Sequence, residues 1–128
     1  MTIWDDFSIE ARVREILDVP SHVPGHHFGR PFLTAYQIAI SFAERFPSDH
    51  GLIGKQIGGK DAGPSQSLAQ YLAKELSAGI KNRRLPGIEG ADLHGTHLKK
   101  LEYRSSEGNL EASTGSSSEL SMFRVCDD

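Results

Sequence analysis

Residues 58–87 read GGKDAGPSQSLAQYLAKELSAGIKNRRLPG, a glycine-rich loop that runs directly into an amphipathic segment. Ser65 and Ser67 are both good N-cap residues, and the leucines at 68, 72 and 76 recur at helical spacing. We therefore predict a helix from Ser65 or Ser67 to about Arg83, lying with one face on a core. Gly79 weakens its last turn by about 1 kcal/mol relative to alanine.

Two further helices are expected upstream of this segment. Residues 5–18 place apolar side chains at positions 9, 13, 16 and 17, and the prolines at 20 and 24 end that pattern. A second helix is expected to begin near Pro31, a favoured first-turn residue, and to run to about Phe46, where Pro47 stops it. Apolar side chains cover more than half of its circumference, so we expect it to be the central buried helix. Residues 48–65 hold five glycines and one proline, so only a short helical turn around 52–55 is expected there.

After residues 85–91 the apolar pattern changes from a helical to a strand period. Residues 97–106 and 108–115 are predicted as two strands joined around 107–109, and 119–125 as a third strand. The predicted fold class is therefore α+β, with three main helices followed by a small antiparallel sheet. This is the element order of a winged-helix domain. We expect a single domain over residues 1–128, with a short flexible tail at 126–128.

Charge is unevenly distributed along the chain. The 128 residues carry a net charge of −3, but residues 51–104 hold nine Lys or Arg against five Asp or Glu. The middle of the chain is therefore +4 and the remainder −7. This division suggests a polyanionic partner for the middle, although such charges can also serve only to solvate a surface.

Composition and motifs also bear on the compartment. No apolar run approaches the roughly 20 residues needed to cross a bilayer, and the N-terminus has no basic region followed by an apolar block. The single cysteine, Cys126, cannot form an internal disulfide. We therefore expect a cytoplasmic protein that does not associate with membranes.

The predicted third helix suggests a function. In a winged-helix domain this helix enters the major groove and the hairpin touches the DNA backbone. Helix positions opposite the leucines are all polar and none is acidic, and Gln, Lys and Arg pair with base edges or phosphates. We predict a small regulatory protein that binds double-stranded DNA, expected as a homodimer, with the helix at about 65–83 as reader. The predicted DNA-contacting residues are Gln66, Gln70, Lys74, Ser77, Lys81, Arg83, Arg84, Lys55, Lys60, Lys99 and Lys100.

Other kinds of site find less support. The loop at 58–65 lacks the Walker pattern, and Asp61 would repel a phosphate there, so its glycines are interpreted as turn formers. Six histidines occur without a cysteine partner or ligand spacing, so no metal or cofactor is predicted. No nucleophile elbow, paired-carboxylate or Cys–His signature is present, which favours a protein without catalytic residues.

The main alternative is a protein-interaction module of the inhibitor or immunity type. The 26–32 loop places Phe28 and Phe32 beside Arg30, a composition that is enriched in interface hot spots. The acidic first helix, with Trp4 and Phe7, is interpreted either as a dimer contact or as part of the core. Under this alternative the acidic face and the 26–32 loop bind a protein partner, whereas a DNA-binding protein would use the +4 middle.

Overall fold

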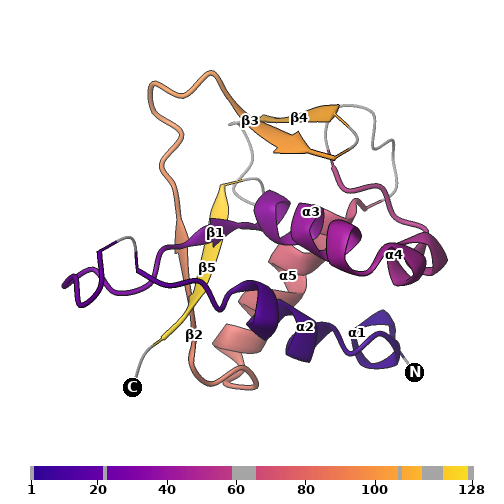
Figure 1. Ribbon diagram of the computed structural model, residues 1–128, viewed down its shortest axis with the longest axis horizontal. Coiled ribbons are helices and arrows are strands. Elements are labelled where there is room, and N and C mark those ends of the chain that lie inside the picture. The colour runs from indigo at the N-terminus through magenta and orange to yellow at the C-terminus, as the bar shows by residue number, and fades with distance from the viewer. Residues whose placement is uncertain (1, 22, 59–65, 107, 114–119, 127–128) are drawn as a thin grey trace.

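Helices and strands are interleaved along the chain in the computed structural model, which describes residues 2–21, 23–58, 66–106, 108–113 and 120–126 (Figure 1). The helices in these residues are α1 (Ile3–Asp6), α2 (Ile9–Ile16), α3 (Ala35–Arg45), α4 (Pro47–Ile53) and α5 (Leu68–Lys81). The strands are β1 (Leu33–Thr34), β2 (Ile88–Asp92), β3 (Lys100–Ser105), β4 (Gly108–Ser113) and β5 (Ser121–Val125). The predicted mixed α+β class is confirmed.

Helix α5 begins where its N-cap chemistry predicts. The Ser67 hydroxyl accepts a hydrogen bond from the Gln70 N–H at 3.1 Å, and the Gln70 side-chain oxygen accepts one from the Ser67 N–H at 3.1 Å. This reciprocal capping box satisfies two donors that a helix N-terminus otherwise leaves unpaired. The leucines at 68, 72 and 76 are fully buried, so the predicted core-facing stripe is confirmed.

Helix α3 begins four residues later than predicted. Its capping box joins Thr34 and Gln37, so the helix starts at Ala35, while Leu33 and Thr34 form the short strand β1. The prediction of a start at Pro31 was wrong because a capping box is a stronger start signal than a proline three positions upstream. The predicted central burial of this helix is confirmed, since α3 contacts α2, α4, α5 and three strands.

The helix predicted over 5–18 and the segment that follows Pro47 also differ from the prediction. The helix predicted over 5–18 is two helices, because Ser8 adopts a left-handed backbone with φ of 50° between α1 and α2. Its apolar stripe at 9, 13, 16 and 17 is nevertheless buried as expected. Pro47 ends α3 and also opens α4, because a proline at the first helical position lacks only an N–H that would be unpaired there anyway.

The prediction of one sheet after the helices was wrong. The described strands form two antiparallel sheets, a three-stranded sheet in the order β1-β5-β2 and a separate β3-β4 hairpin. The hairpin itself is confirmed, with Tyr103 opposite Leu110. Strand β5 does not join it but lies between β1 and β2, where Phe123 is opposite both Leu33 and Gly90. The hairpin lies over α3, against which the Tyr103 ring stacks on Tyr36 at 5.1 Å (Figure 1).

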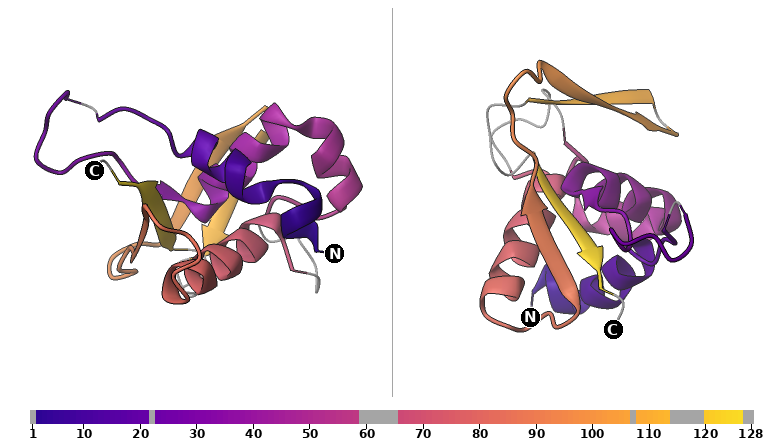
Figure 2. Two further views of the ribbon diagram at one scale, coloured as in Figure 1. Left: turned by 90° about the horizontal axis from the view of Figure 1, so that it is seen from below. Right: turned by 90° about the vertical axis from the view of Figure 1, so that its left-hand side faces the viewer.

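Helices and the three-stranded sheet form two layers. Helices α2, α3 and α5 lie on one side of the sheet, as the right-hand view of Figure 2 shows. Phe123 points into this core and is 2% exposed, whereas Arg124 belongs to the opposite face because neighbouring strand residues alternate in direction. Residues 23–32 form a segment that projects away from the body beside that opposite face (Figures 1 and 2).

The glycine near the end of α5 has a packing role. A Cβ atom at Gly79 would lie 2.4 Å from Leu85 Cδ1 and 2.7 Å from its Cγ. Leu85 is itself buried, where the chain turns back from α5 toward β2. Gly79 weakens the last turn of the helix, but the absence of a side chain there allows Leu85 to pack closely against it.

We expect Gly79→Ala to destabilise the protein by about 1–3 kcal/mol, because overpacking against Leu85 outweighs the gain of about 1 kcal/mol in helix propensity. Urea unfolding measures the change. The control is Ser77→Ala on the exposed side of the same helix, for which a change within about 0.5 kcal/mol is expected. A Gly79→Ala protein more stable than wild type would contradict this packing role.

Candidate functional site

The outer side of α5 carries a short polar stripe. Lys74, Ser77 and Lys81 are all exposed and follow one another at intervals of three and four residues, so they share one face of the helix. We call these three residues the α5 stripe. Ser77 and Lys81 also line a groove of about 270 Å³ against Gly90, Ala91 and Asp92 of β2. The stripe thus presents two ammonium groups and a hydroxyl to solvent.

Two arginines continue the positive charge beyond the helix. Arg83 and Arg84 are exposed, and Arg83 adopts a left-handed backbone with φ of 60°. The Arg84 N–H donates to the Gly79 carbonyl at 2.8 Å, which closes the end of α5. These two side chains lie within three residues of Lys81, at the same end of the helix.

Other predicted DNA-contacting residues have structural partners. The Gln70 side-chain oxygen is part of the capping box. The Lys55 ammonium donates to the Gln66 carbonyl at 3.2 Å and lies 5.7 Å from the centre of the Tyr71 ring. Gln66 is half-buried, and Lys60 lies outside the described residues. The side chains of Gln70 and Lys55 therefore hold the start of α5 in place.

The predicted hairpin lysines have different surroundings. Lys99 is exposed, whereas the Lys100 ammonium contacts Glu111 at 2.9 Å and Glu102 at 3.0 Å. Hydrogen bonds to Glu111 and then Glu102 raise the pKa of Lys100. The positive charge of Lys100 is therefore compensated by two carboxylates of the same hairpin, which weakens its attraction for a phosphate.

The acidic N-terminal segment does not present a continuous apolar face. Trp4 and Phe7 are half-buried and pack against the core, so the second of the two sequence interpretations of this segment fits the structure. Its carboxylates are partly paired, since Glu10 accepts from Arg14 at 3.1 Å and Asp18 from Arg30 at 2.6 Å. Asp5 and Asp6 remain exposed.

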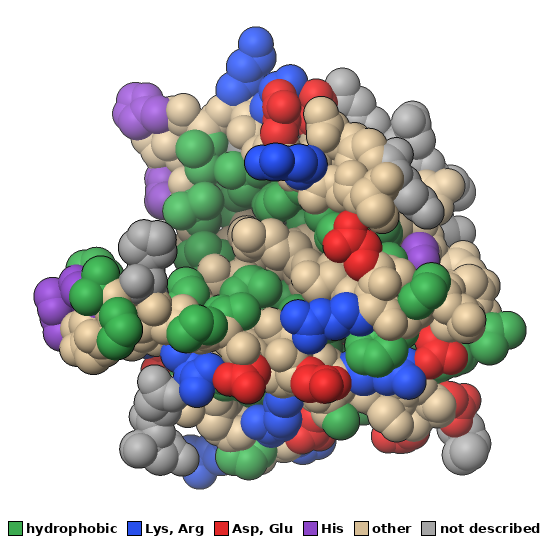
Figure 3. Space-filling view, viewed as in Figure 1, with side chains coloured by type: hydrophobic (Ala, Val, Ile, Leu, Met, Phe, Trp, Pro, Cys, Tyr) green, Lys and Arg blue, Asp and Glu red, His purple; other side chains and the backbone are tan. Residues whose placement is uncertain are grey.

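A second surface lies at the projecting segment, residues 23–32. Phe28 is 71% exposed and Val23 is 54% exposed. Figure 3 shows hydrophobic and histidine side chains gathered on the lobe that projects at the left. Beside them is a hollow of about 590 Å³, which we call the Phe28 hollow; it is lined by Val23, His26, Phe28, Gly29, Arg30, Pro31, Phe32 and Arg124.

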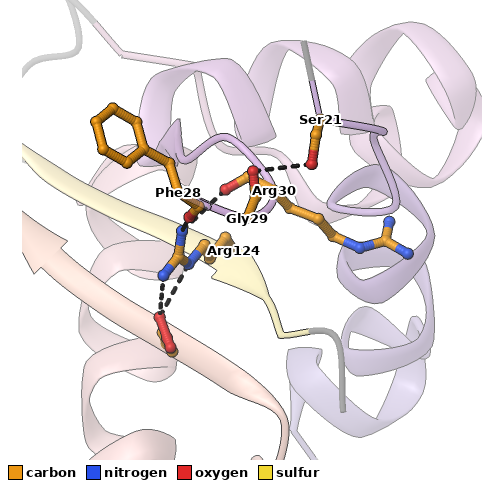
Figure 4. A network of polar contacts seen from close by, with 6 residues as sticks. Ser21, Phe28, Gly29, Arg30 and Arg124 are labelled. Atoms are coloured by element: carbon orange, nitrogen blue, oxygen red, sulfur yellow. Dashed lines mark hydrogen bonds and ion pairs between the residues drawn. The ribbon is translucent and has the colours of Figure 1, made fainter. Parts of the chain in front are cut away.

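Arg124 holds this segment against the sheet (Figure 4). One guanidinium nitrogen donates to the Phe28 carbonyl at 2.6 Å and to the Arg30 carbonyl at 3.1 Å. The other two bind a Glu89 carboxylate oxygen at 2.9 and 2.8 Å, and the guanidinium lies 4.5 Å from the centre of the Phe32 ring. The planar, five-donor guanidinium thus ties two strands to one loop, which a lysine could not do.

Local contacts order the rest of the segment. The Ser21 hydroxyl donates to the Gly29 carbonyl at 2.9 Å (Figure 4), and Gly29 has a φ of 80°, which favours glycine. At the tip, the His26 and His27 rings stack at 4.2 Å, and Phe28 packs edge-on to both. Phe28 is therefore exposed to solvent but packs against both histidine rings.

The sequence did not identify Arg124 as a site residue. Arg124 is a single arginine in a short apolar strand. This pattern does not indicate which distant loop the arginine contacts. The contact to Phe28 spans 96 positions in the sequence. In contrast, Phe28 and Phe32 were found from composition alone.

No group of three or more His, Cys, Asp or Glu residues that could hold a metal ion occurs in the described part of the chain. None of the described helices is both long and apolar enough to span a membrane.

Replacing Arg124 tests how the projecting segment is held. We expect Arg124→Lys to destabilise the protein by about 1–3 kcal/mol, because charge-assisted hydrogen bonds to two carbonyls and a carboxylate are lost. Hydrogen exchange at the amides of residues 26–32 should accelerate more than exchange in α5. Arg14→Lys, which alters a surface pair on α2, is the control and should change stability by less than about 0.5 kcal/mol. Unchanged exchange in the segment would contradict the anchoring role.

Acid should weaken the same anchor. Hydrogen bonds from Arg124, and then from Cys126, lower the pKa of Glu89 below its ordinary value of 4.5. The folded state therefore favours the ionised carboxylate, so its stabilising contribution is present above that value and is lost as the pH falls through the lowered pKa. Thermal unfolding followed from about pH 6 to pH 3 should show a steeper loss of stability for wild type than for Glu89→Gln. Parallel curves would contradict this assignment.

Comparisons with known proteins give no family. No protein-family model matches the chain, and no curated protein or solved structure is significantly similar to it. Function is therefore inferred from the α5 stripe and the Phe28 hollow.

Proposed function

We propose that this protein binds double-stranded DNA on a winged-helix-like frame, with α5 as the reader helix. The observation that carries the proposal is the α5 stripe. It presents Lys74, Ser77 and Lys81 to solvent on the side of the helix opposite fully buried leucines. Lysines bind phosphates as point charges and, like serine, also bind base edges in the major groove.

The order of elements supports the choice of α5. Helix α2, strand β1, helix α3, helix α5, strand β2 and strand β5 follow one another, and β5 pairs with both β1 and β2. In helix-turn-helix proteins a later helix of the motif lies in the major groove, and α5 is the third main helix of this chain. Helix α4 lies between α3 and α5 in the chain, and the β3-β4 hairpin lies between β2 and β5.

The predicted DNA-contacting residues are proposed to have three different roles, according to their surroundings in the structure. The α5 stripe would face the major groove, and Arg83 and Arg84 would contact phosphates at its end. Lys99 is exposed next to the hairpin, and Lys100 is paired with two carboxylates. Gln70 and Lys55, which hold the start of α5, would act by fixing its position rather than by reading bases.

Reversal of charge on the α5 stripe tests the proposal. Fluorescence anisotropy with mixed-sequence duplex DNA at about 50 and 200 mM salt should show binding that weakens steeply with salt. The Lys74→Glu, Lys81→Glu double variant should lose binding at the lower salt. The Lys74→Arg, Lys81→Arg variant keeps both charges and is the matched control that should bind.

Either of two results would overturn the proposal. One is the absence of binding by wild type at about 50 mM salt, where phosphate contacts are strongest. The other is equal binding by the wild type and the glutamate double variant, which would place DNA elsewhere on the protein. Circular dichroism of each variant separates lost binding from lost folding.

A second candidate function is protein interaction through the 26–32 loop. The observation in its favour is the exposure of Phe28 beside an apolar hollow of about 590 Å³. Large aromatic side chains near arginine are the residues that most often dominate interface energetics. The acidic N-terminal segment contributes less to this candidate, because Trp4 and Phe7 pack against the core.

A further inference from the structure

We propose that the protein partner of the Phe28 hollow is a second copy of this chain, bound about a two-fold axis with each Phe28 seated in the hollow of the other copy. The proposal rests on the second candidate function, for which it names the partner. It does not depend on DNA binding, which the α5 stripe would carry.

The projecting segment offers a rigid apolar group. Phe28 and Val23 are 71% and 54% exposed, whereas most large apolar side chains of the described residues are buried or half-buried. Turns hold the segment, since the His26 N–H donates to the Val23 carbonyl and the Gly29 N–H to the His26 carbonyl, both at 3.0 Å. The Arg124 guanidinium donates a hydrogen bond to the Phe28 carbonyl and so fixes the backbone at this residue. A group that is already ordered loses little conformational entropy when it binds.

The same segment also forms the receiving surface. The Phe28 hollow, about 590 Å³, is large enough for an aromatic side chain and its neighbours, and Pro31, Phe32 and Val23 give it an apolar lining. A two-fold interface uses one patch of each copy against the same patch of the other, so that patch must be self-complementary. A projecting aromatic ring at the rim of an apolar hollow meets this condition within a single loop.

The charges at the hollow favour a copy over a strongly charged partner. Arg124 is paired with Glu89, and Arg30 with Asp18, so both cations lining the hollow are compensated within the chain. Identical patches bring identical charges together, and like charges placed face to face cost several kcal/mol. A patch whose cations are already paired avoids this repulsion. The α5 stripe carries two lysines on one face, so two copies meeting at that stripe would repel each other.

Sedimentation of the 128-residue chain across micromolar concentrations tests the proposal. The monomer mass is 14.0 kDa, and wild type should shift toward twice that mass as concentration rises. Phe28→Asp should weaken dimerisation by roughly 30-fold or more, because it removes a central aromatic and places two carboxylates in the interface. Leu52→Asp is the matched control. Leu52 is an apolar residue that is 76% exposed on α4, and its replacement should leave the dimer unchanged.

Three outcomes would overturn the proposal. Wild type that remains a monomer at every concentration would assign the hollow to a different protein partner. A dimer that Phe28→Asp does not weaken would place the interface elsewhere. Equal weakening by Leu52→Asp would indicate non-specific association of exposed apolar groups. Thermal unfolding of both variants confirms that they fold, and anisotropy with duplex DNA shows separately whether the α5 stripe functions.

Discussion

The orientation of α5 is the constraint on which the rest of the structure depends. Its first turn is fixed by the reciprocal hydrogen bonds of Ser67 and Gln70, and its last turn by the approach of Leu85 to Gly79. Between these ends the leucines at 68, 72 and 76 are buried without remaining exposure. Since both ends and one face are fixed, the opposite face cannot rotate, and the α5 stripe is held toward solvent.

Strand β5 connects this core with the second surface. Phe123 and Arg124 are neighbours in one strand and therefore point to opposite faces of the sheet. Phe123 completes the core beneath α5, where a Cβ atom at Gly90 would also lie 3.3 Å from Ile80 Cδ1. Arg124 binds Glu89 and the loop carbonyls on the other face. The packing of Phe123 thus sets the position from which Arg124 holds the Phe28 hollow.

The parts of the fold that were predictable from the sequence are the parts encoded locally. The faces of α2 and α5, the Ser67 cap and the β3-β4 hairpin follow from spacing or turn chemistry within a few residues. Strand β2 was missed because Gly90 and the acidic residues at 89 and 92 obscure its alternation, and its pairing with β5 spans the whole hairpin. The α5 stripe was likewise predicted from spacing, whereas the anchoring of the 26–32 loop by Arg124 was not, because it requires knowledge of which distant segments meet.

The two candidate surfaces are separated by the fold itself. The Phe28 hollow lies on the Arg124 face of the sheet, and α5 packs on the Phe123 face with its stripe turned outward. The sheet and the body of α5 therefore lie between them, so occupation of one surface does not sterically exclude occupation of the other. Symmetric DNA sites are bound by dimers whose reader helices remain free. Strand β5 thus directs Phe123 into the core beneath α5 and Arg124 to the Phe28 hollow, so the packing of one strand contributes to both proposed surfaces.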